Sequence, residues 1–141
     1  MGRPEFPRRM RRIFNEQNNL QGAAIMPTVK LVTSQKLVHG DRESLALELT
    51  GIAAGELNKP TSVTQAVVTD DTVIAFGGDF TAPSAFIEVT SVGGFSRDVC
   101  RRLCAAFCSL LEKYGITPQR VYICFNDKKG EEFGWNSNLL G

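Results

Sequence analysis

The chain has 141 residues, with 43% hydrophobic and 22% charged side chains and a formal net charge of +1. This length suits one domain with a single core, and this composition is ordinary for a globular protein. There is no apolar run long enough to cross a bilayer and no marked excess of charge. We therefore expect neither a membrane nor a nucleic acid as a partner.

Charge is divided unevenly along the chain. Residues 1–25 contain five arginines and two glutamates, a charge of +3, whereas residues 26–141 carry 11 basic and 13 acidic side chains, a charge of −2. The first segment has no sustained hydrophobic period and lacks the apolar stretch of a secretory signal. We predict a flexible leader over residues 1–25, interpreted as a tag, an upstream extension or an unprocessed segment, and one domain over residues 26–141. An arginine-rich mitochondrial presequence is a further alternative, which Pro4 and Pro7 disfavour.

In the first half of this domain the residue pattern predicts a strand, a helix and a strand. Thr28–Thr33 alternates and is rich in β-branched residues, as a strand is. Asp41 is the expected N-cap of a helix that residues 58–60, Asn-Lys-Pro, bring to an end. Val63–Thr69 is typical of a second strand, and Ile74–Phe76 of a short further one. The helix should bury an apolar face made of Leu45, Leu49, Ile52, Ala53 and Leu57.

The second half repeats this order. Ala85–Val92 is a predicted strand, and Ser96 is the expected N-cap of a second helix. Gly115 and Pro118 should end that helix, and Val121–Phe125 is the last predicted strand. The helical period is carried by Val99, Leu103, Ala106, Phe107, Leu110, Leu111 and Tyr114.

The cysteines favour a structural role over a metal site. Cys100, Cys104 and Cys108 recur every fourth residue and therefore share one face of the second helix. The single histidine, His39, is far away in sequence, and no tight Cys-x-x-Cys pair is present. We predict buried, reduced thiols that act as small apolar side chains, and no bound metal. Such thiols point to a reducing compartment at synthesis.

The two halves align without a gap when the chain is shifted on itself by 58 positions. Leu45 then meets Leu103, and Pro60 meets Pro118. The sequence thus predicts an α/β (α+β) fold built from a duplicated β-α-β unit, with a four-stranded mixed sheet and two helices on one face. The other sheet face would be bare, so we expect oligomerisation to cover it.

Six short motifs follow one another along the domain. They are Met26-Pro27-Thr28-Val29, Asn58-Lys59-Pro60, Phe76-Gly77-Gly78, Thr90-Ser91-Val92-Gly93-Gly94, Arg120-Val121-Tyr122-Ile123 and Phe133-Gly134-Trp135-Asn136. In this order and spacing they resemble the macrophage migration inhibitory factor and D-dopachrome tautomerase family of the tautomerase superfamily. The resemblance covers residues 26–141.

The resemblance implies a tautomerase-like homotrimer with active sites between neighbouring subunits and no cofactor. It implies keto–enol tautomerisation of a small aromatic keto acid or enol, such as phenylpyruvate or dopachrome, with the N-terminal amine of Pro27 as general base. Lys59 is the implied cation for the substrate carboxylate, and Val92 offers backbone contacts at a strand end. Tyr122 of the neighbouring subunit supplies a hydroxyl group. The remaining implied site residues are Cys124 across the interface and the pocket-wall residues Phe133 and Trp135.

These residue types suit the reaction. An α-amino group has a pKa of about 8, and an apolar wall lowers it further towards neutrality. The reaction also needs a cation for the carboxylate and a donor near the developing oxyanion. Taken alone, Pro27 could simply start an edge strand, and Lys59 could be a solvated lysine at a helix end. The order of all the motifs together favours the functional interpretation.

The sequence also departs from the family pattern. Cys124 stands where the family often has asparagine, and Ser84 and Ile87 stand where some relatives have a redox Cys-x-x-Cys, so we expect no thiol–disulfide activity. The C-terminal residues 138–141 also differ from the family ending, which can reshape the pocket edge. While residues 1–26 remain attached, the nitrogen of Pro27 is an amide and cannot act as a base.

Two alternatives to a tautomerase follow. The first is a trimeric, cytokine-like protein with a vestigial active site, which would bind a cell-surface receptor. The second is a ferredoxin-like domain for a small molecule or RNA, which the acidic balance of residues 26–141 disfavours. We expect a cytoplasmic protein, with secretion independent of a signal peptide as the alternative location.

Overall fold

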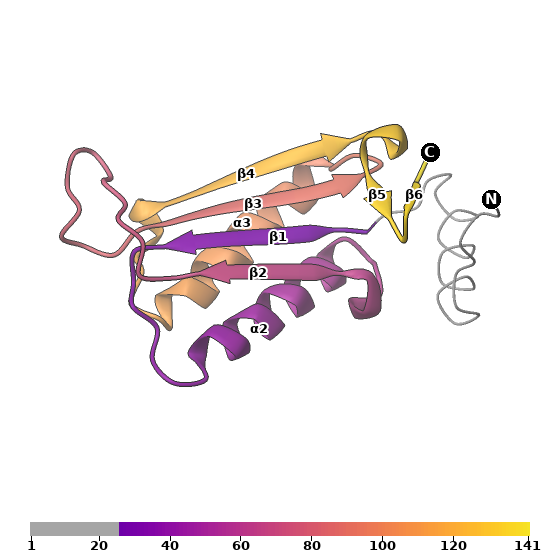
Figure 1. The fold of residues 1–141 in the computed structure, drawn as a ribbon. Helices are drawn as coiled ribbons and strands as arrows, with labels where there is room; N and C mark the ends of the chain where they lie inside the picture. Colours follow the sequence, from indigo (N-terminus) through magenta and orange to yellow (C-terminus); the bar gives the residue numbers. More distant parts are fainter. Residues whose placement is uncertain (1–25) are drawn as a thin grey trace.

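A computed structural model describes residues 26–141 (Figure 1). The predicted leader, residues 1–25, lies outside the described residues. The main elements are β1 (Thr28–Thr33), α2 (Asp41–Glu56), β2 (Gln65–Thr69), β3 (Ala85–Val92), α3 (Arg97–Glu112) and β4 (Val121–Lys128). Shorter ones are the 3-10 turns η1 (Thr61–Val63), η2 (Pro118–Arg120) and η3 (Gly130–Glu132), and the strands β5 (Gly134–Trp135) and β6 (Asn138–Leu139).

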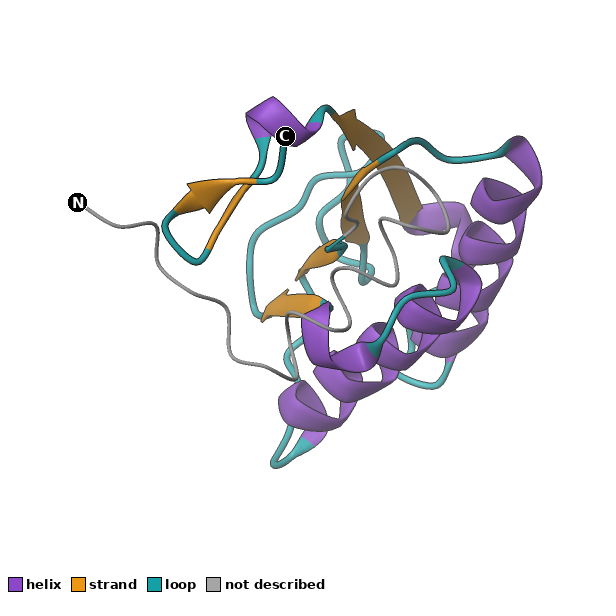
Figure 2. Cartoon of the chain, turned by 90° about the vertical axis from the view of Figure 1, so that its right-hand side faces the viewer, coloured by secondary structure: helices purple, strands orange, loops and turns teal. Residues whose placement is uncertain are grey.

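The four long strands form one mixed sheet in the order β2-β1-β3-β4. The pairs β1–β2 and β3–β4 are parallel, as a helical crossover within each half requires, and β1 and β3 pair antiparallel at the centre. Both helices cover the same side of this sheet (Figure 2). The predicted duplicated β-α-β fold is therefore confirmed.

Alternate residues of the central strands point into the core between the sheet and the helices. Val29 and Leu31 of β1 are fully buried, and they pair with the equally buried Val89 and Ile87 of β3. Helix α3 contributes Phe107, the largest fully buried side chain. The helices bury most of the apolar stripes predicted for them, namely Leu45, Leu49, Ala53, Leu103, Phe107, Leu110 and Leu111. The other predicted members are only half-buried: Ile52, Leu57, Val99 and Tyr114 pack against this core, and Ala106 lies outside it.

Neither helix covers the opposite face of the sheet (Figure 1). It exposes 39% of Val67 on β2, 37% of Phe86 on β3 and 64% of Tyr122 on β4. Lys30 of β1 pairs with Glu88 of β3 on this face, so it is mixed in character. Apolar side chains left open in this way are consistent with contact to another subunit.

The two helices begin differently. Ser96 caps α3 as predicted, because its hydroxyl group accepts a hydrogen bond of 3.1 Å from the backbone N–H of Val99. The prediction that Asp41 caps α2 was wrong, since Asp41 is the first helical residue and the N-cap is Gly40. Gly40 has a left-handed backbone with φ of 77° and provides no side-chain cap.

Some strand boundaries also differ from the prediction. β2 begins at Gln65 and not at Val63, because Thr61–Val63 winds into η1 first. Ile74–Phe76 forms no strand, since within this segment only Phe76 makes a bridge, to Asp79. β4 continues past Phe125 to Lys128, because β3 offers partners as far as Val92.

The cysteines are free but less buried than predicted. Cys100, Cys104 and Cys108 are half-buried, and Cys124 is exposed. The three helical cysteines lie on α3 beside the buried stripe of Leu103 and Phe107, at the edge of the core, and not inside it. Burial still raises the pKa of each of these three thiols by desolvation.

Candidate active site

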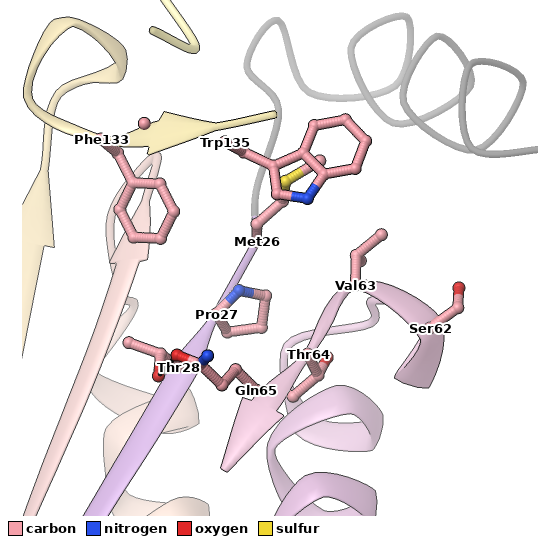
Figure 3. Close-up of a pocket in the computed structure, with 10 residues that line it drawn as sticks. Met26, Pro27, Thr28, Ser62, Val63, Thr64, Gln65, Phe133 and Trp135 are labelled. Atoms are coloured by element: carbon pink, nitrogen blue, oxygen red, sulfur yellow. Dashed lines mark hydrogen bonds between the residues drawn. The ribbon is translucent and has the colours of Figure 1, made fainter. Parts of the chain in front are cut away.

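A cavity of about 290 Å³ opens at the start of β1. The chain enters β1 there through Pro27, while η1 and the start of β2 form one side and the C-terminal segment forms the other (Figure 3). The lining residues are Met26, Pro27, Thr28, Ser62, Val63, Thr64, Gln65, Phe133, Gly134 and Trp135.

Pro27 is held firmly in this cavity. It is fully buried, and its carbonyl oxygen accepts a hydrogen bond of 3.0 Å from the backbone N–H of Gln65, which fixes it to the start of β2. The side chains of Thr28 and Gln65 also bond, with 3.1 Å between Oγ1 and Oε1. A proline costs no hydrogen bond at this position, because it precedes the first residue of the strand. In this chain its nitrogen is part of the Met26–Pro27 amide.

The aromatic wall comes from the C-terminal segment, where β5 turns back on β6. Trp135 pairs with Asn138 in this hairpin, and the backbone N–H of Leu140 donates to the carbonyl of Phe133 at 3.0 Å. The turn residues Asn136 and Ser137 have left-handed backbones, with φ of 51° and 67°. The structure therefore brings Phe133 and Trp135, which the resemblance assigns to the pocket wall, to the same cavity as Pro27.

Lys59 lines a second cavity of about 330 Å³, between the end of α2 and the start of α3. Its backbone N–H donates to the carbonyl of Ala54 at 2.8 Å, after Asn58 has turned the chain with φ of 54°. Only 8% of Lys59 is exposed, and this burial lowers the pKa of its ammonium group. The simpler reading of Lys59 as a solvated helix-end lysine does not agree with this burial.

Val92 and Ser91 end β3 near the start of β1. Val92 is buried and lines neither of the two cavities, whereas the buried Ser91 lines the cavity of Lys59. Within the described part of the chain the hydroxyl group of Ser91 has no hydrogen-bond partner. Sequence reasoning singled out Val92 and overlooked Ser91, since alternation alone does not reveal which of two neighbours faces a cavity.

Tyr122 and Cys124 lie far from Pro27 of their own chain. The register pairs Val32 of β1 with Phe86, and Phe86 with Tyr122, whereas Pro27 precedes the other end of β1. Pro27 and Val32 are five residues apart along β1, which is about 17 Å along the sheet. Any contact of Tyr122 with a Pro27 cavity would therefore require a second subunit. Cys124 is exposed on the same strand, with its Sγ 3.8 Å from Oδ1 of Asn126.

The neighbours that complete the Pro27 cavity were not predicted. Met26 opens the first motif but was given no role in the site, whereas residues 62–65 belong to no motif and are placed beside Pro27 by η1 and the register of β2. Within residues 26–141, no group of three or more His, Cys, Asp or Glu side chains could hold a metal ion. No helix in this range is long and apolar enough to cross a membrane.

Comparison with known proteins agrees with this architecture. Residues 26–141 match the macrophage migration inhibitory factor family. A macrophage migration inhibitory factor homolog from Trichinella spiralis is 35% identical over 120 residues, which cover 82% of this chain and all of the relative. The factor from Meriones unguiculatus is 30% identical over 99 residues, covering 70% of this chain and 85% of the relative.

Solved structures show the same fold. A macrophage migration inhibitory factor-like protein from Entamoeba histolytica superposes with a TM-score of 0.75 at 25% identity, over 81% of this chain and 98% of that protein. A homologue from Prochlorococcus marinus gives a TM-score of 0.75 at 27% identity, over 81% and 99% of the two chains. The resemblance seen in the motifs is thus confirmed, and the chain belongs to the macrophage migration inhibitory factor family of the tautomerase superfamily.

Proposed function

We propose that this protein is a keto–enol tautomerase whose general base is the amine of Pro27, formed when residues 1–26 are removed. The observation that carries the proposal is the position of Pro27, which is buried in a cavity walled by Phe133 and Trp135. An aromatic keto acid such as phenylpyruvate would place its ring against this wall. Membership of the tautomerase superfamily supports isomerase chemistry of this general kind.

The reaction needs one base that both takes and returns a proton. The lone pair of the Pro27 nitrogen would remove a proton from the carbon next to the keto group. The electron pair of that C–H bond then forms the C=C bond, and the carbonyl oxygen becomes an enolate. The protonated amine returns the proton to this oxygen and gives the enol. The amine starts from a pKa of about 8, and burial lowers it further, so a substantial fraction is neutral at pH 7.

Lys59 and a neighbouring subunit would complete the site. Lys59 would hold the substrate carboxylate, and its desolvated ammonium group strengthens such an ion pair because little water screens it. Tyr122 is remote from Pro27 in its own chain, so in this proposal its hydroxyl group reaches the site of an adjacent subunit. We therefore propose a homotrimer in which the exposed sheet face bearing Phe86 and Tyr122 lies towards other subunits.

The decisive experiment compares a chain beginning at Pro27 with the full chain beginning at Met1. The processed chain should convert phenylpyruvate or a dopachrome ester, whereas the full chain should be at least about a hundredfold slower, because an amide nitrogen is not a base. Mass spectrometry checks that the full chain has not been trimmed. Equal rates in both forms would exclude the amine as the base.

Light scattering tests the proposed trimer and should give about three times the chain mass. A stable monomer would contradict a site shared between subunits.

A cytokine-like binding protein with a vestigial site is the second candidate. The observation that favours it is the Met26–Pro27 amide, which blocks the amine in the chain as it stands. The replacement of the family's asparagine by Cys124 also favours it. A processed trimer that is inactive on every keto acid tested, yet binds a cell-surface receptor, would support this candidate over the enzyme.

A further inference from the structure

The loop between β2 and β3, residues 70–84, lies at the end of the sheet opposite Pro27, next to the start of β4 (Figure 1). At its tip Phe76 and Asp79 face each other across the two glycines 77 and 78. The N–H of Phe76 donates to the carbonyl of Asp79 at 2.9 Å, and the reverse bond measures 3.1 Å. Both glycines have positive φ, 60° and 81°, as a tight hairpin turn of this type requires.

Arg120 ties this loop to the start of β4. Its Nε donates to the carbonyl of Pro83 at 3.1 Å, and its Nη2 donates to the carbonyl of Asp79 at 2.8 Å. Its Nη1 lies 3.5 Å from the Asp79 carboxylate, and its Cζ lies 5.5 Å from the centre of the Phe76 ring. Only 16% of the Arg120 side chain is exposed. The planar guanidinium group thus holds three parts of one loop at once, which a lysine ammonium group could not do.

Hydrogen bonds from Thr81 stabilise the ionised carboxylate of Asp79, which contacts Arg120. Its Oδ1 accepts hydrogen bonds of 2.8 Å and 2.6 Å from the backbone N–H and the hydroxyl group of Thr81. These hydrogen bonds are the main reason that the pKa of Asp79 lies below its usual value, with Arg120 adding to the effect. The carboxylate therefore stays ionised throughout the neutral range, so its contact with Arg120 does not depend on pH there.

The loop in turn contacts Tyr122. The rings of Phe76 and Tyr122 lie 5.0 Å apart at an angle of 55°, which is the tilted geometry that aromatic pairs prefer. Tyr122 is 64% exposed, so its hydroxyl group is accessible at the surface of the subunit. Phe86 of β3 is the register neighbour of Tyr122 within the sheet, and the Phe76 ring is the contact that reaches Tyr122 from the loop.

We infer that Arg120 is a positioning residue that fixes the Tyr122 hydroxyl group through Phe76 for use in the site of a neighbouring subunit. This inference rests on the proposed function for the role of Tyr122, but the chain of contacts from Arg120 to Tyr122 stands without it. Arg120 does not touch the substrate in this scheme. Its replacement should act only through the orientation of Tyr122.

Fluorine NMR tests the contacts without any substrate. The chain has two tyrosines, so 3-fluorotyrosine labelling gives two resonances, and Tyr122→Phe identifies the one from Tyr122. Arg120→Lys should shift or broaden the Tyr122 resonance and leave that of Tyr114 in place. Phe76→Leu should do the same. The matched control is Arg102→Lys, because Arg102 binds Glu56 at 2.7 Å between the helices and should move neither signal. An unchanged Tyr122 resonance in folded Arg120→Lys protein would overturn the inference.

Kinetics in the processed chain test the consequence. Arg120→Lys should lower kcat/KM about threefold to tenfold while the trimer persists. In a Tyr122→Phe background it should lower kcat/KM no further, because the hydroxyl group that it positions is already absent. Independent, multiplicative losses would refute a route through Tyr122. An inactive wild-type processed chain would instead contradict the proposed function alone, since the NMR result does not depend on turnover.

Discussion

The start of β1 and the start of β3 occupy equivalent places in the two halves, yet their surroundings differ. Ser84, just before β3, is fully buried, and its carbonyl accepts bonds of 2.7 Å from the Thr33 hydroxyl group and 3.0 Å from the N–H of Ser34. Pro27, just before β1, is equally buried but faces a cavity. In the duplicated fold, hydrogen bonds thus fill the space at the start of β3, whereas the start of β1 has a cavity that can hold a ligand.

The segments after the two helices show a second difference. A shift of 58 positions places Lys59 on Thr117 and Pro60 on Pro118. Both halves end their helix before this proline, but Thr117 is exposed whereas Lys59 is buried. The second half shows that the fold does not require a buried lysine at this place. A buried lysine at this place is thus a feature of the first half alone, which makes Lys59 the residue to test for a function.

The largest effect on this comparison is expected at Pro27. In the processed chain, Pro27→Gly keeps a primary amine but loses the rigid secondary amine, so kcat should fall about tenfold to a hundredfold while the trimer persists. Ser84→Ala is the matched control in the other half. It removes a buried hydroxyl group that has no hydrogen-bond partner among the described residues, so activity should stay constant and stability should not fall. Steady-state kinetics measure the activity of the two variants, and thermal melting measures their stability. An equal loss of activity in Pro27→Gly and Ser84→Ala would contradict the different roles of the two strand starts.

Lys59→Met should mainly weaken substrate binding. We expect KM for carboxylate substrates to rise about tenfold with a smaller change in kcat, as for a contact made equally in the ground and transition states. Lys113→Met, at the exposed end of α3, is the control and should leave both constants unchanged. A loss confined to kcat would show that Lys59 acts on the chemical step and not on carboxylate binding.

Lys59→Met should also change how the stability of the fold depends on pH. Burial lowers the pKa of Lys59 below its usual value of 10.5, so the folded chain binds this proton less tightly than the unfolded chain. Between the lowered folded value and 10.5 the unfolded state carries more protons, and wild-type stability should therefore gain with rising pH. Lys59→Met should lack this gain. Urea unfolding at neutral and alkaline pH measures the difference, and parallel pH profiles would contradict it.

The sequence anticipated the fold better than the site, for physical reasons. β1 and β3 have the predicted bounds, because their alternating patterns are long and lie between turns. The two-residue strands β5 and β6 were missed, since such short strands have no period and depend on the left-handed turn at Asn136 and Ser137. The repeat itself could be read from spacing, because a packed core constrains both halves alike.

For the site, sequence spacing could not place residue 27 beside residues 133–135, which lie more than a hundred positions away. That grouping came only from the family resemblance. The burial of Lys59 was also unforeseen, since a charged residue after a helix is usually solvated, whereas here the end of α2, the end of β3 and the start of α3 line its cavity. Of the two predicted N-caps, Ser96 was correct because its side chain makes a local hydrogen bond, and Asp41 was wrong by one residue.

Those caps provide a test of about 1 kcal/mol. Ser96→Ala should destabilise the fold by about 1 kcal/mol through loss of the bond to the N–H of Val99. Gly40→Ala should cost a similar amount, about 1 kcal/mol, for a different reason: its left-handed backbone strains a side chain although no atom lies within 4 Å of the added carbon. Gly40→Asn should restore part of this loss, since asparagine tolerates that conformation, whereas Ser96→Asn should restore the cap. Urea unfolding at one fixed protein concentration measures these changes in the free energy of unfolding. It would show whether α3 depends on a side-chain cap and α2 on the left-handed backbone of Gly40.

The smallest effects are expected at the cysteines, which only the second half contains. Cys104 is half-buried on α3, so Cys104→Ala should cost about 1 kcal/mol or less through a small cavity, and the exposed Cys124→Ala should change the stability of the subunit fold little. Desolvation raises the pKa of Cys104, so its thiolate fraction at pH 8 is low and a small thiol reagent should label it slowly. Cys124 should react first, because a site shared between subunits must admit substrate-sized molecules. Labelling followed by peptide mass spectrometry ranks the four thiols. Faster labelling at Cys104 than at Cys124, or zinc bound in stoichiometric amount, would contradict a purely structural role for the thiols of α3.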